Sequence, residues 1–280
     1  MQSNNPVFAR SDGFNGRGGA PTTTTSNDPS QWRIDLDAQP GASLGGGTST
    51  GRMTLDTVVE KTAISLGLLV ATAAVAWFLI GDLATEGALA TAFAFAMGGA
   101  IVGLVLSLVN SFKKVVSPAL VLAFAAVEGV FVGAFSKIIS SYVGDPTIVF
   151  QAVLATMVAF FGTLAAYKFF NIQVTDKFRK VMTIAIFSFV GVMLVNFVLS
   201  LTGVLESGGL RGFNTLGLVV SAIAVVLAVF MLIMDFDFVE KGIEAGLPER
   251  ESWRAAFGLT VTLVWLYIEL LRILAILRGD

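Results

Sequence analysis

Seven long apolar runs, separated by short polar connections, constrain the fold of this chain more than any other feature. Each run has about the 20 residues that a helix needs to cross a hydrocarbon layer of about 30 Å. Lipid satisfies no backbone hydrogen bonds, so a segment at that depth must be helical. The runs cover roughly residues 62–80, 88–109, 118–139, 147–167, 181–201, 215–234 and 255–277. The sequence therefore predicts an all-α protein with seven transmembrane helices, whose first partner is the lipid bilayer.

Composition excludes several functional classes. Hydrophobic residues make up 55% of the chain and charged residues only 14%, against about 25% charged in a soluble domain. The net charge of −2 gives no indication of nucleic acid as a partner. The chain has no Cys and no His, which removes thiolate nucleophiles, Ser-His triads and nearly all zinc hydrolase sites. We therefore expect neither an enzyme nor a cofactor.

The first fifty residues differ in kind from the rest. They are rich in Gly, Ser, Thr, Asn and Pro, with a run of Thr at 22–25 and of Gly at 45–47. Such a segment buries too little apolar surface to offset its ordering entropy, and it lacks the features of a signal peptide. We expect a disordered cytoplasmic tail over residues 1–52 and a seven-helix transmembrane domain over residues 53–280.

Basic residues indicate the orientation. Fourteen of the eighteen Lys and Arg residues lie in the tail, at the start of the first run, or in and beside the second, fourth and sixth connections. An excess of Lys and Arg marks the cytoplasmic side of a membrane protein. The N-terminus should then be cytoplasmic and the C-terminus outside, in a multi-pass protein of the cell membrane. A re-entrant last run would instead return the C-terminus to the cytoplasm.

Two Gly-xxx-Gly pairs, Gly99 with Gly103 and Gly129 with Gly133, indicate close helix packing. Packing within one chain is favoured over dimerisation, because Gly is common in membrane helices.

Ionisable residues at membrane depth are the candidate functional residues. Glu128 lies about 15 Å into the third run, near the midplane. Asp235 and Asp237 end the sixth run, and Glu269 and Arg272 lie in the outer half of the seventh. A charge at the bilayer centre costs at least about 2.5 kcal/mol, so such residues face a bundle interior or a water path. Carboxylates at successive depths suit a cation or proton path.

Structural interpretations of the same residues stay open. Glu269 and Arg272 are three residues apart and can pair on one helix face. Asp235 and Asp237 can be solvated residues at a helix end. Glu128 can be a protonated residue that is bonded to a neighbouring helix.

The chain resembles the Bax inhibitor-1 family, the transmembrane Bax inhibitor motif proteins. Three stretches carry the resemblance, in the same order as in the family: Ser117-Pro118 with Glu128 to Ser136, Met234-Asp235-Phe236, and Leu270-Leu271-Arg272-Ile273-Leu274. The tail, with Asn5-Pro6-Val7-Phe8 and Gly13-Phe14, is similar to a bacterial, actinobacterial branch.

The resemblance implies a central seventh helix and a pH-sensitive calcium leak that is gated by paired carboxylates of the sixth and seventh helices. Asp235 matches the sixth-helix carboxylate. Alignment on Arg272 places Thr262 at the position of the seventh-helix Asp. Either Glu128 or Glu269 replaces the missing partner, or this branch has lost the gate.

Two functions therefore remain. The first is a calcium or cation leak channel or transporter that uses Asp235, Glu128 and Glu269, with Asp235 and Glu128 as candidate calcium ligands and with calcium or protons as the transported species. The second is a non-transporting regulator that binds membrane proteases or other membrane-protein partners in stress survival. Ion flux through purified protein in liposomes separates the two.

The charge asymmetry predicts the topology. Reporter fusions after residues 50, 114, 177 and 250 should read cytoplasmic, and a fusion after residue 280 should read external if the last helix spans. Two external readings among the first four would overturn this orientation.

Overall fold

The computed structural model describes residues 51–279, which contain seven long α-helices and one short 3-10 helix. All seven are long and apolar enough to cross a membrane. In chain order the elements are α1 (Leu55–Ile80), α2 (Glu86–Phe112), α3 (Pro118–Val143), α4 (Thr147–Phe169), α5 (Asp176–Leu201), η2 (Glu206–Arg211), α6 (Thr215–Glu244) and α7 (Glu251–Arg278). The expected seven-helix architecture is confirmed. The expected disordered tail lies outside the described residues, apart from Gly51 and Arg52.

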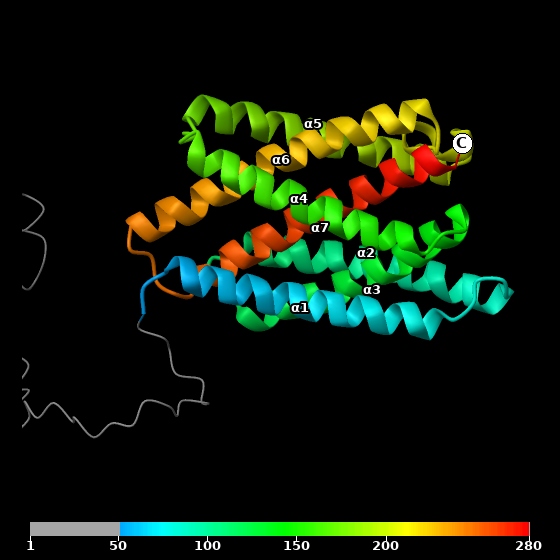
Figure 1. Ribbon diagram of the computed structural model, residues 1–280, viewed down its shortest axis with the longest axis horizontal. Helices are drawn as coiled ribbons and strands as arrows, with labels where there is room; N and C mark the ends of the chain where they lie inside the picture. Colours follow the sequence, from blue (N-terminus) through cyan, green and yellow to red (C-terminus); the bar gives the residue numbers. More distant parts are fainter. Residues whose placement is uncertain (1–50, 280) are drawn as a thin grey trace, which may run out of the picture. The chain divides into compact units, whose positions relative to one another are not determined.

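Helix α7 is the centre of the bundle, as the family resemblance implies. It packs against α1, α3, α4 and α6, and Figure 1 shows it running between α1–α3 on one side and α4–α6 on the other. The most apolar part of α7 is 67% buried, against 11–44% for the other six helices. Polar side chains on α7 must therefore find partners inside the protein.

The last helix runs from one end of the bundle to the other. At its start, Ser252 lies 2.8 Å from Thr57 of α1, and Glu249 just before it pairs with Lys61 at 2.6 Å. At its finish, Arg278 contacts Asp145 in the link between α3 and α4. We call these the Lys61 end and the Arg278 end of the bundle.

Several helices extend beyond their apolar runs. The largest extension is in α6, which continues to Glu244. The expectation that Asp235 and Asp237 end this helix is therefore wrong, and both lie inside it. Hydropathy marks where apolar residues stop, whereas backbone hydrogen bonds continue past that point into polar sequence.

The glycine pairs allow close contact within the chain. A Cβ atom on Gly129 would lie 2.3 Å from the carbonyl oxygen of Leu69, and one on Gly133 would lie 2.3 Å from that of Ala73. Helices α1 and α3 therefore approach each other backbone to backbone. Gly99 packs against the backbone of Phe131 of α3, whereas Gly103 faces the side-chain carboxylate of Glu128. The interpretation of these pairs as packing within one chain is confirmed.

Enlarging Gly133 should destabilise the bundle. Gly133→Val forces α1 away from α3 and should cost about 3 kcal/mol, the upper part of the usual range for overpacking. The measurement is thermal unfolding in detergent micelles. Gly162→Val on α4 is the matched control, because nothing lies within 4 Å of a Cβ atom there. Equal unfolding midpoints for the two variants would contradict the close contact.

Candidate functional site

The candidate site is a contact between a carboxylate of α6 and a hydroxyl of α7. Thr262 Oγ1 donates a hydrogen bond to Asp235 Oδ2 over 2.7 Å. Thr262 is 2% exposed. Asp235 Oδ1 faces Gly258 of α7, where a Cβ atom would make a tight contact of 3.3 Å with it. The residue at the family's seventh-helix position thus contacts Asp235 directly, although it is not an acid.

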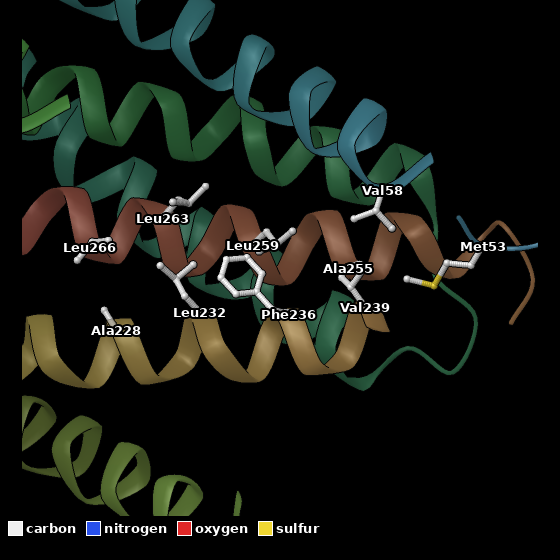
Figure 2. Close-up of a cluster of buried hydrophobic side chains, with 10 residues drawn as sticks. All are labelled: Met53, Val58, Ala228, Leu232, Phe236, Val239, Ala255, Leu259, Leu263 and Leu266. Atoms are coloured by element: carbon white, nitrogen blue, oxygen red, sulfur yellow. The ribbon is translucent and has the colours of Figure 1, made fainter. Parts of the chain in front are cut away.

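Apolar side chains surround this contact. Phe236, next to Asp235, and Leu259 and Leu263, on either side of Thr262, belong to one buried cluster. Figure 2 shows Phe236 pointing from α6 toward Leu259 on α7, with Leu232 below Leu263 along the same interface. The hydrogen bond between Asp235 and Thr262 therefore lies in apolar surroundings, where an unpaired polar group is costly.

Glu128 lies at a different helix contact. Its carboxylate sits against Gly103 of α2, since a Cβ atom on that residue would lie 2.6 Å from Glu128 Oε2. Helix α2 packs on α3 and α1, and contacts neither α6 nor α7. Among residues 51–279, nothing forms a hydrogen bond with Glu128. The structure does not bring Glu128 and Asp235 onto one helix pair.

Asp237 is an ion-paired residue that ties α6 to α5. It is 4% exposed and accepts hydrogen bonds from Arg179 at 2.8 Å and from Lys241 at 2.9 Å. Arg179 comes from the start of α5, whereas Lys241 lies one turn along α6. The alternative that Asp237 is a solvated residue at a helix end is therefore not observed.

Glu269 pairs with a residue that the sequence analysis did not consider. Arg211, the last residue of η2, donates to Glu269 Oε1 at 2.7 Å. Arg272 instead donates to the carbonyl oxygen of Arg211 at 2.5 Å. The hydrogen bonds of Glu269 and Arg272 thus go to η2 and not to each other. They hold η2 over the Arg278 end of α7.

Two more contacts complete this end of the bundle. Asn196 of α5 accepts a hydrogen bond from the backbone of Leu210 at 2.8 Å, which anchors η2. Arg278 contacts Asp145 and donates to Gln151 at 2.7 Å. Hydrogen bonds from the Thr147 side chain and backbone lower the pKa of Asp145 and favour the carboxylate that Arg278 contacts. These partners are far apart in sequence, so periodicity and spacing cannot reveal them.

Removing the charge of Glu269 should destabilise the protein. Glu269→Leu leaves Arg211 without its partner, and breaking a buried pair on one side costs about 3 kcal/mol or more. Arg211→Met in the same chain should recover most of that loss. Glu251→Gln is the control, because Glu251 pairs with Arg254 at a part-exposed site and should cost under about 1 kcal/mol. Thermal unfolding in detergent measures all four proteins. A double variant no more stable than Glu269→Leu would contradict the pair.

Comparison with known sequences agrees with this architecture. The sequence model described as Bax inhibitor 1 like matches residues 5–279. No curated protein matches the chain. The family match spans nearly the whole sequence and includes all seven helices with the contact between Asp235 and Thr262. The chain is therefore a membrane protein of the Bax inhibitor-1 family.

Proposed function

We propose that this protein is a pH-sensitive calcium leak pathway in which the proton on Asp235 controls the contact between α6 and α7. The hydrogen bond between Asp235 and Thr262 carries the proposal. Asp237 and Glu269 are each paired with a basic side chain. Asp235 has no basic partner among residues 51–279 and is bonded only to a neutral hydroxyl. Of these three acids, Asp235 is therefore the one whose charge no basic side chain holds in place.

The hydroxyl of Thr262 has two acceptors within reach and a single hydrogen. Asp235 Oδ2 is 2.7 Å away and the carbonyl oxygen of Gly258 is 3.1 Å away. When Asp235 is ionised, Thr262 donates to the carboxylate. When Asp235 is protonated, it can donate to Thr262, which then donates to Gly258. Protonation thus preserves the bond between the helices and removes the charge.

The sign of the pH dependence follows from this geometry. The protonated pair is neutral and fully hydrogen bonded, so it stabilises the contact between α6 and α7 in apolar surroundings. The ionised carboxylate has one donor, and hydration of its charge favours separation of the two helices. We therefore expect the closed state at acid pH and more flux as the pH rises.

Calcium suits the groups that such an opening would expose. It prefers several hard oxygen ligands, and this contact offers a carboxylate, a hydroxyl and a backbone carbonyl. Residues 51–279 contain no group of three or more acidic side chains that could hold a metal ion. A calcium ion would therefore keep much of its hydration and be passed along. Glu128 is proposed as a second carboxylate of the ion path, at the separate contact between α3 and α2.

The regulator function is the alternative proposal. For a regulator, the mixed charges of the sixth connection would serve as a docking surface, yet Glu249 pairs with Lys61 and Arg250 donates to the carbonyl oxygen of Val116 at 2.9 Å. Both of these residues of the sixth connection therefore contact other parts of the same chain. No contact among the described residues favours a partner surface over a leak path.

Flux measurements with variants of the pair test the proposal. Purified protein in liposomes that contain a calcium dye is followed across roughly pH 5 to 8. Wild-type flux should rise with pH by at most about tenfold per unit, because a single proton is released. Asp235→Asn keeps the size, removes the titration and should flatten this dependence. Thr262→Asp creates two coupled carboxyls and should spread the response over two steps.

Two controls make the result decisive. Thr262→Val keeps the shape of the side chain and removes the one side-chain donor to Asp235 within residues 51–279, so the pH midpoint should move while the slope stays that of one proton. Glu128→Gln should lower flux without removing the pH dependence. Identical pH profiles for wild type, Asp235→Asn and Thr262→Val would refute the proposed gate, and an absence of flux in wild type would favour the regulator.

A further inference from the structure

An apolar groove runs along the bundle between α1 and α4. These two helices do not contact each other among the described residues, although both pack against α7. The gap forms two adjoining hollows of about 660 Å³ and about 290 Å³. Leu66, Met157 and Leu263 line both hollows, so the groove is continuous.

The groove has the length and chemistry of the hydrocarbon layer. On α1 its lining extends from Leu55 to Trp77, about 33 Å at the rise of an α-helix. That length matches a hydrocarbon core of about 30 Å. Its rim is exposed, with Val59, Val70 and Phe161 each about 60% accessible. Within a bilayer these side chains face lipid tails.

The mouth of the larger hollow carries charges of both signs. Lys168 in the last turn of α4 and Glu240 and Glu244 near the end of α6 all line this hollow, and all three are exposed. The hydroxyl of Tyr167 donates to Glu240 and fixes that carboxylate at the mouth. Among the described residues, neither Lys168 nor Glu244 forms an ion pair. One cationic and two anionic groups thus lie where the apolar lining ends.

We propose that this groove is a binding site for an aminophospholipid. An acyl chain lies along the apolar lining between α1 and α4, the phosphate contacts Lys168, and the ammonium group contacts Glu240 and Glu244. A phosphoethanolamine headgroup has one negative and one primary ammonium charge, so it complements this mouth. A purely anionic headgroup would meet two carboxylates. The charge pattern also selects a lipid over a second copy, whose apolar helix face would offer no opposite charge to these three groups.

The site is connected to the proposed gate through its lining. Phe236, Leu259 and Leu263 line the larger hollow and also flank the contact between Asp235 and Thr262. A bound acyl chain therefore packs against the outer side of the side chains that surround that contact. Lipid binding itself does not require that the gate conducts, so the two proposals can fail separately.

Photocrosslinking tests the site in a bilayer. Full-length protein is placed in vesicles of phosphatidylethanolamine and phosphatidylglycerol in equal amounts, with a trace of either lipid carrying a photoreactive acyl chain. Peptide mass spectrometry should locate the phosphatidylethanolamine label mainly on the α1 and α4 residues that line the groove. The preference over phosphatidylglycerol should be about fivefold, which corresponds to about 1 kcal/mol from exposed ion pairs.

Matched variants separate groove and headgroup. Ala63 is exposed and lines the groove, so Ala63→Trp should reduce groove labelling several-fold. Ala71→Trp is the control, since Ala71 is exposed on α1 but lines neither hollow. Lys168→Gln with Glu244→Gln should abolish the preference between the two lipids, whereas Lys180→Gln on α5 should leave it intact. Even labelling around all helices, unchanged labelling in Ala63→Trp, or crosslinked dimers joined through the groove would overturn the proposal.

Discussion

Helix α7 is enclosed by other helices, so its polar side chains must be satisfied inside the protein. Several of them reach other parts of the bundle. Ser252 bonds to Thr57 of α1, Thr262 to Asp235 of α6, and Tyr267 lies 2.7 Å from Ser136 of α3. Glu269 and Arg272 hold η2. Lipid could replace none of these bonds, which makes α7 the element on which the positions of the other helices depend.

The polar contacts along α7 and just before its first residue differ in strength. At the Lys61 end, Glu249 is paired with a lysine, and at the Arg278 end Glu269 is paired with an arginine. Between them, Asp235 meets a hydroxyl. Charged pairs are roughly twice as strong as neutral hydrogen bonds. With Asp235 protonated, the bundle is thus held by charged pairs at both ends and by neutral hydrogen bonds between them, as the proposed gate between α6 and α7 requires.

The sequence was sufficient to predict the helices and the centre of the fold, because apolar length and family motifs are local signals. It also singled out Asp235 and Thr262, but not that they are bonded to each other. Thr262 looked like a lost gate residue, whereas its hydroxyl still reaches Asp235. The partners of Glu269 and Asp237 could not be predicted. Arg211 and Arg179 come from other elements, and which basic residue reaches which acid is decided by how the helices pack.

The most direct test of the central claim is infrared difference spectroscopy of the protein in bilayers as the pH changes. We expect a carboxyl C=O band that disappears on ionisation, is absent in Asp235→Asn and shifts in frequency in Thr262→Val because a hydrogen bond is lost. Glu128→Gln should leave that band in place. A titrating band that is the same in wild type, Asp235→Asn and Thr262→Val would contradict the claim that the proton on Asp235 is held at the contact between α6 and α7.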